Sequence, residues 1–114
     1  MKSDNISSHT WGYYANLLNN HEKKYQVKKI LLQKNKKIPL QSHAKCCKHL
    51  IICRGKGKFQ LDDKYIILSG NAHIFIPIDA KHSIENISEE EIDIIEIKIG
   101  EELDDNDVIV YEDN

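Results

Sequence analysis

The chain is short of proline, arginine and long apolar runs. Among its 114 residues there are two prolines and a single arginine, Arg54. No apolar stretch reaches the roughly 20 residues that a membrane-spanning helix needs. Residues 1–10 are polar and lack the apolar segment of a secretory signal. These absences argue against a membrane protein and make a soluble, cytoplasmic protein the default expectation.

Cysteine is also scarce, and its number is odd. Of the three cysteines, Cys46 and Cys47 are adjacent in sequence, where a disulfide is geometrically unfavourable. A small secreted scaffold held by disulfides would carry a denser, even set. The sequence therefore argues against that class, and reduced thiols agree with a cytoplasmic location.

A large excess of charge of one sign is absent as well, since 16 basic and 18 acidic side chains leave a net charge of −2. The charges are unevenly spread, because lysines crowd the segment 23–37 and acidic residues crowd the segment 101–107. The lysine-rich segment nevertheless lacks a helix-turn-helix or single-strand-binding signature. We therefore expect no nucleic-acid partner and no membrane partner, and we look for a small-molecule ligand.

A chain of this length can bury one modest core, so a single domain is expected. Short segments rich in Ile, Val, Leu and aromatic residues alternate with Gly, Asn, Asp and Ser, which is typical of strands and turns. The tightest turn signal, Leu61-Asp62-Asp63-Lys64, predicts a hairpin. The predicted strands are Tyr25–Gln33, Ile38–His43, His49–Cys53, Lys58–Leu61, Tyr65–Leu68, Ala72–Ile76, His82–Ile87, Glu91–Ile99 and Val108–Tyr111.

These short strands predict an all-β fold. Closure into a sandwich or small barrel removes exposed sheet edges, and a jelly-roll β-barrel with one ligand in its mouth fits best. One strand breaks the regular alternation, because Ile94 and Ile95 lie side by side, which predicts a bulge or burial on both faces. Glu96 is expected to face the interior only with such a bulge, whereas Glu85 should face away.

Two polar motifs stand out in this strand pattern. Gln41 and His43 are two residues apart, so their side chains share one face of a strand, and His82 on a distant strand can complete a metal site with them. The motif residues are Gln41, His43, Lys48 and Gly55, followed by Asn71, Pro77, His82 and Asn86. Their spacing resembles the two motifs of the cupin superfamily, which implies a single-domain cupin.

A closer resemblance covers the chain from about Trp11 onward. It is similar to type II phosphomannose isomerases, and specifically to the C-terminal cupin domain of the bifunctional enzymes that join mannose-6-phosphate isomerase to mannose-1-phosphate guanylyltransferase. The segments that carry this likeness are Trp11-Gly12-Tyr13-Tyr14, Tyr25-Gln26-Val27-Lys28-Lys29-Ile30, Leu40-Gln41-Ser42-His43, Leu61-Asp62-Asp63-Lys64, Ile76-Pro77, Ala80-Lys81-His82, Ile99-Gly100-Glu101 and Tyr111-Glu112-Asp113.

The resemblance implies a divalent metal in the barrel mouth and isomerisation between mannose 6-phosphate and fructose 6-phosphate. Such a reaction removes a proton next to a carbonyl, so it needs a base and an electrophile that stabilises the enediolate oxygen. A metal held by Gln41, His43 and His82 would be that electrophile. Two imidazole nitrogens and one amide oxygen suit Zn, Mn, Ni or Fe(II).

The first motif departs from the family pattern at four positions. Lys45 replaces a histidine, Cys46 an arginine, Lys48 the glutamate ligand and Leu50 a tryptophan. An ammonium group cannot ligate a metal, and its charge repels a divalent cation. Lys48 therefore predicts that metal binding is weakened or lost.

Three interpretations of Lys48 stay open. As a desolvated amine it could be a catalytic base or react with a sugar carbonyl. As a cation it could replace the metal and bind a phosphate or carboxylate together with Lys45. In the third interpretation the site has decayed, and the amine points to solvent. Two functional hypotheses follow: a mannose-6-phosphate isomerase-like enzyme, and a non-catalytic cupin that binds a sugar phosphate or another small anion.

Asn35, Asn71 and Asp79 stand where the cupin motifs usually have glycine. Asn and Asp tolerate left-handed backbone angles, so we expect the turns to be kept. Residues 1–18 are expected to form an N-terminal extension to a cupin barrel of residues 19–114. Because such an extension often packs on a second subunit, a homodimer is expected.

Overall fold

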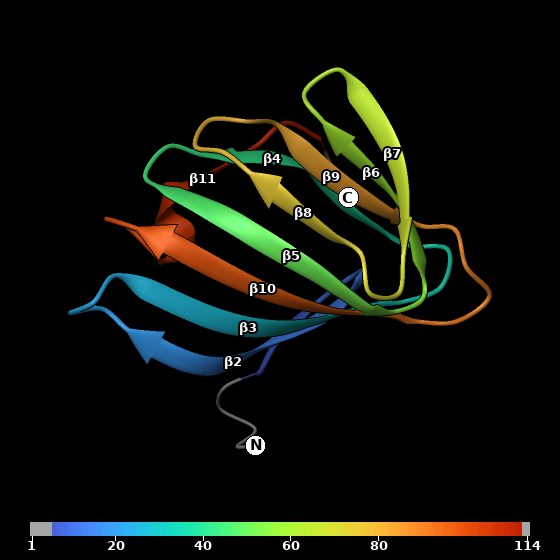
Figure 1. The fold of residues 1–114 in the computed structure, drawn as a ribbon, viewed down its shortest axis with the longest axis horizontal. Helices are drawn as coiled ribbons and strands as arrows, with labels where there is room; N and C mark the ends of the chain where they lie inside the picture. Colours follow the sequence, from blue (N-terminus) through green and yellow to red (C-terminus); the bar gives the residue numbers. More distant parts are fainter. Residues whose placement is uncertain (1–5, 113–114) are drawn as a thin grey trace.

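The structure, a computed structural model, describes residues 6–112 as two antiparallel β-sheets that face each other (Figure 1). The larger sheet has six strands, in the spatial order β1 (Ile6–His9), β2 (Gly12–Asn20), β3 (Tyr25–Leu32), β10 (Ile92–Gly100), β5 (Cys46–Arg54) and β8 (His73–Ile76). The smaller sheet has five, in the order β11 (Val108–Val110), β4 (Lys37–His43), β9 (His82–Asn86), β6 (Lys56–Leu61) and β7 (Lys64–Ser69). The helical element among the described residues is the short 3₁₀ turn η2 (Asp105–Asp107). The predicted all-β jelly-roll architecture is confirmed.

Each predicted strand corresponds to an observed one, with end points that differ by up to three residues. The sequence did not predict β1 and β2, because this segment is rich in Asn and Ser and has few β-branched residues. β2 pairs with β3 from Gly12 opposite Leu32 to Asn20 opposite Tyr25. Residues 6–18 of the expected extension therefore lie in the larger sheet of their own chain, and residues 1–5 lie outside the described residues. Packing on a second subunit, and the homodimer itself, stay predictions.

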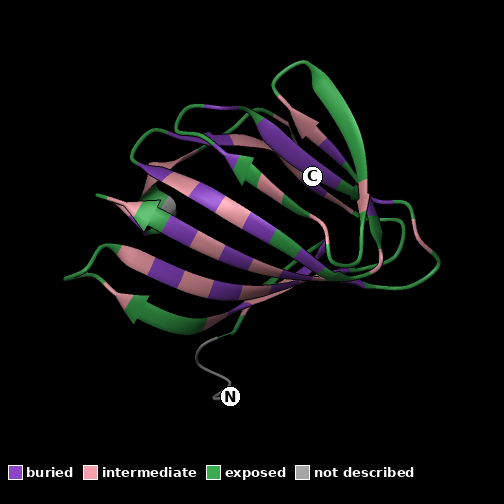
Figure 2. Cartoon of the chain, in the orientation of Figure 1, coloured by how far each residue is buried: buried purple, intermediate pink, exposed green. Residues whose placement is uncertain are grey.

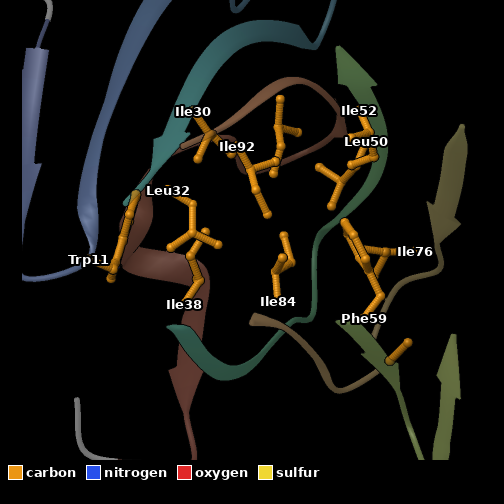
Figure 3. Close-up of a cluster of buried hydrophobic side chains, with 12 residues drawn as sticks. Trp11, Ile30, Leu32, Ile38, Leu50, Ile52, Phe59, Ile76, Ile84 and Ile92 are labelled. Carbon is orange, nitrogen blue, oxygen red and sulfur yellow. The ribbon is translucent and has the colours of Figure 1, made fainter. Parts of the chain in front are cut away.

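The apolar core fills one part of the space between the sheets. Along β3, β10 and β5, buried side chains alternate with half-buried or exposed ones, as the period of a strand requires (Figure 2). Ten of the core side chains are labelled in Figure 3: Trp11, Ile30, Leu32, Ile38, Leu50, Ile52, Phe59, Ile76, Ile84 and Ile92. Burial of a large aliphatic or aromatic side chain contributes about 1.5–3 kcal/mol. This cluster is therefore the main source of stability that holds the two sheets together.

β10 keeps a regular alternation through the isoleucine pair. Its pairing with β3 runs without a shift from Ile92 to Ile99, and a register shift occurs only in the pairing with β5, between Asp93 and Ile94. Ile94 is buried on the inner face, while Ile95 is half-buried on the outer face. The expectation that Glu96 would need a bulge in its own strand was wrong, since Glu96 faces inward by simple alternation. Glu85 is exposed, as expected.

The turns follow the sequence closely. Asn35, Asn71 and Asp79 have φ angles of 63°, 74° and 69°, so the substituted glycine positions keep the left-handed conformation. Asp62 and Asp63 connect β6 to β7 in the predicted hairpin, with Leu61 opposite Lys64. Among the described residues, no helix has the length and apolar character needed to cross a membrane.

Candidate functional site

Polar side chains replace the apolar core at one end of the larger sheet. On β3, β10 and β5 the inward positions change from aliphatic residues to Lys28, Glu96, Lys98 and Lys48. A cavity of about 240 Å³ lies against these four residues and reaches across to the smaller sheet. Its other walls are mostly apolar, formed by Trp11, Tyr14, Ile30, Ile38, Pro39, Leu50, Ile84, Val108 and Val110. The volume lies below the range of about 300–1,000 Å³ typical of drug-sized ligands, so the cavity suits a smaller molecule.

Lys48 connects the polar groups of the cavity. Its Nζ lies 3.2 Å from Nε2 of His82 and 3.4 Å from Oε2 of Glu96. The other ring nitrogen of His82, Nδ1, lies 3.0 Å from the backbone carbonyl of Ala80. A carbonyl oxygen only accepts, so Nδ1 carries the proton and Nε2 offers a lone pair. The Lys48 ammonium therefore donates a hydrogen bond to His82 and forms an ion pair with Glu96.

The charged groups of this wall are almost fully buried. Lys48 and Glu96 are 7% and 5% exposed, and Lys98 is 1% exposed with its Nζ donating to the carbonyl of Leu103 at 2.8 Å. The Nζ of Lys28 lies 4.1 Å from the ring centre of Tyr14. Burial raises the pKa of Glu96, but the neighbouring lysine charges outweigh it and place the pKa below its ordinary value. Among the described residues, three ammonium groups and one carboxylate therefore line the cavity.

Two of the histidines that line the cavity, His43 and His82, are uncharged at neutral pH. Their ring centres are 5.7 Å apart, and both side chains are buried. Burial, assisted by the charge of Lys48, lowers the pKa of His43 to about 2 and the pKa of His82 to about 4. Nδ1 of His43 is buried and has no hydrogen-bond partner among residues 6–112.

The expected metal ligands Gln41, His43 and His82 all line the cavity. As they stand, they do not fit a metal ion. The Nε2 lone pair of His82, which a metal would need, is already engaged by Lys48. Within residues 6–112, no group of three or more His, Cys, Asp or Glu side chains is arranged to hold a metal. An ammonium beside the donor set would also repel a divalent cation.

Lys45 lies apart from this site. It occupies the short connection between β4 and β5, where its backbone N–H donates to the carboxylate of Asp107 at 2.9 Å. Its side chain is exposed, and it borders a shallow surface depression together with Lys24 and Glu101. The structure therefore does not bring Lys45 and Lys48 into one binding site, because a loop residue at this point leaves the interior.

Sequence reasoning missed Lys28 and Lys98 as part of the site and left Glu96 conditional. The signal was present in β10, where charged residues occupy the positions that continue the buried series of Ile92 and Ile94. A charge at an inward strand position is costly unless it is paired or used, so it marks a site. Lys28 on β3 follows the same rule.

Comparison with known proteins agrees with the resemblance seen in the sequence. The family model described as "Mannose-6-phosphate isomerase C-terminal" matches residues 2–113. A mannose-1-phosphate guanylyltransferase of Escherichia coli (strain K12) is 30% identical over 90% of this chain, which corresponds to 21% of that protein. The xanthan biosynthesis protein XanB of Xanthomonas campestris is 26% identical over 90% of the chain and 22% of its own length. The chain thus spans about a fifth of the length of these curated relatives.

Solved structures show the same fold. The cupin domain of Cnp3 from Schizosaccharomyces pombe superposes with a TM-score of 0.74 at 15% identity, over 77% of this chain and 64% of that one. A predicted oxalate decarboxylase from Thermotoga maritima superposes with a TM-score of 0.75 at 21% identity, over 83% of this chain and 90% of that one. At these identities the likeness establishes the cupin fold alone.

Proposed function

Because the chain belongs to the mannose-6-phosphate isomerase C-terminal family, we propose that it binds a small phosphorylated sugar, or a related organic anion, without a metal ion. The observation that carries this proposal is the position of Lys48. Its ammonium engages the lone pair of His82 that a metal would need, and it stands in the cavity wall as a fixed positive charge. The lysine thereby takes over the role of a cation that attracts the ligand.

The charge balance of the cavity supports an anionic ligand. Even with Lys28 set aside, the two buried ammonium groups of Lys48 and Lys98 share the cavity wall with one carboxylate from the part of the chain that the structure describes, Glu96. A buried charge without a counter-charge is costly, and a bound phosphate or carboxylate would offset the excess. Charge-assisted hydrogen bonds from lysine to phosphate are among the stronger ones in proteins.

The pKa values of the side chains in the cavity favour ligand binding over abstraction of a proton from a substrate. A general base works best when its pKa lies near the working pH. Burial leaves His43 and His82 with pKa values of about 2 and 4, and the pKa of Glu96 lies below its ordinary value. None of these three groups is a strong base at neutral pH. Isomerisation of mannose 6-phosphate remains the second candidate, supported by the family and by the buried carboxylate of Glu96 beside position 48.

Calorimetric titration of chelator-treated protein with mannose 6-phosphate tests the proposal. We expect binding without added metal, loss of binding in Lys48→Met, and retention in the matched variant Lys45→Met, whose lysine lies outside the cavity. A coupled assay for fructose 6-phosphate with added Zn, Mn, Ni or Fe(II) tests the second candidate. Turnover that depends on metal would overturn metal-free binding as the function, and failure to bind any phosphorylated sugar or inorganic phosphate would overturn it too.

A further inference from the structure

We propose that strand β7 (Lys64–Ser69) is an interface at which two copies of this chain pair edge to edge, so that their smaller sheets join into one continuous antiparallel sheet. This inference goes beyond the proposed function and does not depend on it, because β7 contributes no residue to the lining of the cavity. It also differs from the homodimer expected through residues 1–18, since residues 6–18 lie in the larger sheet.

β7 is the long apolar edge of the described structure. The edge strands are β1 and β8 in the larger sheet and β11 and β7 in the smaller one. Three of the four residues of β1 are polar, while β8 has four residues and β11 has three. β7 has six residues, and its Tyr65, Ile66 and Ile67 are 62%, 49% and 58% exposed, as the green of this strand in Figure 2 shows.

Natural proteins protect sheet edges against pairing with another chain. Short strands, proline, bulges and charges within the strand are the usual devices. β7 has no proline, its pairing with β6 runs without a bulge, and its one charged residue, Lys64, stands at the end of the strand. The edge therefore keeps the form of a strand that can receive a partner strand.

The backbone groups of Tyr65 and Ile67 point to the open side of β7. At the end of the strand, the carbonyl of Ser69 accepts a hydrogen bond from the N–H of Ala72 at 3.0 Å, so it faces away from β6. The backbone groups of an antiparallel strand face the same neighbour at every second residue. The N–H and C=O groups of Ile67 and Tyr65 therefore also face away from β6, on the side where no described strand pairs with β7.

A second copy of β7 matches this edge in side chains as well as in backbone. Ile66 lies opposite the core residue Phe59, so it belongs to the inner face of the sheet, and Tyr65 and Ile67 belong to the outer face. A two-fold axis through Ile66, perpendicular to the sheet, places Ile66 opposite its own copy and Tyr65 opposite Ile67 of the second copy. This pair exchanges N–H···O=C bonds in both directions. It also joins an aromatic to a β-branched side chain, which is a favourable cross-strand combination.

The same register brings no like charges together, because Lys64 lies opposite Leu68 of the second copy. The contact uses the same strand on both copies, so it closes at a dimer and does not continue into a fibre. A single strand edge offers less area than a standard interface of about 1,200–2,000 Å². We therefore expect a weak dimer whose population depends on protein concentration.

Sedimentation velocity and amide hydrogen exchange of the full chain test the pairing. Between about 10 µM and about 1 mM, the range of weak association, we expect the average mass to rise from that of a monomer toward that of a dimer. At the upper concentration the amides of Tyr65 and Ile67 should exchange about tenfold more slowly, because they are bonded to the second copy. The amide of Ile66 already faces β6 and should exchange at the same rate throughout.

Charge variants at the two-fold axis test the identity of the partner. Ile66→Lys and Ile66→Glu each place like charges opposite each other across the axis, so each variant alone should stay monomeric. An equimolar mixture of the two brings opposite charges together and should associate again. The matched controls, Ile109→Lys and Ile109→Glu, alter a residue that is 52% exposed on β11, the opposite edge of the same sheet, and should associate like the unaltered protein. Melting temperatures show that the variants fold.

A chain that stays monomeric at every concentration would overturn the proposal, and so would assemblies larger than a dimer. A dimer that persists in both single variants at Ile66, or that forms without slower exchange at Tyr65 and Ile67, would assign the contact to another surface. Loss of the dimer in the Ile109 variants as well would make the added charge, and not the edge of β7, the cause. The exchange rates of the unaltered chain decide the question even where a variant fails to fold.

Discussion

At the scale of single residues, position 48 decides what the cavity can hold. Replacing Lys48 by Glu would remove the ammonium from His82 and place a carboxylate near Gln41, His43 and His82. Carboxylate, imidazole and amide groups are ligands for Zn and Mn. We expect Lys48→Glu to bind one such ion per chain, as measured by elemental mass spectrometry after dialysis, and the unaltered protein to bind none.

The matched control is Lys48→Met, which removes the same charge without adding a ligand. Without metal, Lys48→Glu should also melt below Lys48→Met, because two carboxylates at positions 48 and 96 repel each other in a buried site. Added zinc should reverse that loss. Equal metal content in the two variants would contradict the view that the missing glutamate is what prevents metal binding.

The buried histidines His43 and His82 should make the stability of the protein depend on pH in the acid range. Their pKa values in the folded chain, about 2 for His43 and about 4 for His82, lie below the ordinary 6.5. Below pH 6.5 these histidines therefore bind protons in the unfolded chain but not in the folded one. The free energy of unfolding consequently falls as the pH falls. The slope is about 1.4 kcal/mol per pH unit for each histidine, or about 2 kcal/mol each between pH 6.5 and pH 5.

Urea unfolding at a series of pH values measures this slope. The contribution is complete above pH 6.5, is lost down to about pH 4 for His82, and continues to fall toward pH 2 for His43. The pKa of Glu96 is lowered from its ordinary 4.5 by the neighbouring lysine charges, so the stability from its charge is present above pH 4.5 and is lost as the pH falls below that value. The double variant His43→Gln/His82→Gln should flatten the profile between pH 6.5 and pH 5. A profile that keeps its slope in this variant would assign the acid sensitivity to other groups.

At the scale of elements, the close approach of β2 to β3 depends on Gly12. Its φ of 148° is unusual for a residue with a side chain, and a Cβ at this position would lie 2.0 Å from the carbonyl oxygen of Leu31. Gly12→Ala should therefore force the two strands apart and lower the free energy of unfolding by about 1–3 kcal/mol or more. The adjacent Trp11 is the one tryptophan of the chain, so its fluorescence reports the change.

Gly70→Ala is the matched control for this prediction. A Cβ at Gly70 has its nearest contact at 3.6 Å, with the carbonyl oxygen of Cys53, which is ordinary van der Waals distance. This variant should keep the unfolding midpoint of the unaltered protein. Similar losses in both variants would mean that the effect comes from replacing glycine in general and not from the contact between β2 and β3.

Sequence reasoning predicted elements better than it predicted the site. Hydrophobic composition and turn residues located the strands from β3 onward, and the pattern is clearest in β3, β5 and β10, which bury alternate side chains. β1 and β2 lack that pattern and are fixed by pairing across the sheet, which a local pattern does not encode. Glu96 stayed conditional and Lys98 escaped notice for a related reason: their partners, Lys48 and the carbonyl of Leu103, are brought to them only by the tertiary fold.

At the scale of the whole molecule, stability and binding rely on different side chains of the same interior. The apolar cluster of Figure 3 holds the sheets together and includes none of the charged side chains proposed to bind the ligand, although Trp11, Ile30, Ile38, Leu50 and Ile84 also line the cavity. Small domains that need a metal to fold unfold when it is removed. Because this core is continuous across both sheets, we expect a chelator to leave the melting temperature unchanged.

A ligand should stabilise the molecule where a metal does not. Binding to the folded chain alone adds about 2.7 kcal/mol when the ligand concentration is 100 times Kd, and 1 kcal/mol shifts the melting temperature of a domain of 60–100 residues by roughly 4–8 °C. Mannose 6-phosphate at saturating concentration should therefore raise the melting temperature by about 10 °C or more in differential scanning calorimetry, and should leave Lys48→Met unchanged. A melting temperature that falls with chelator and recovers with zinc would instead make a metal part of the fold, and Lys48 would then have to leave His82 when the metal binds.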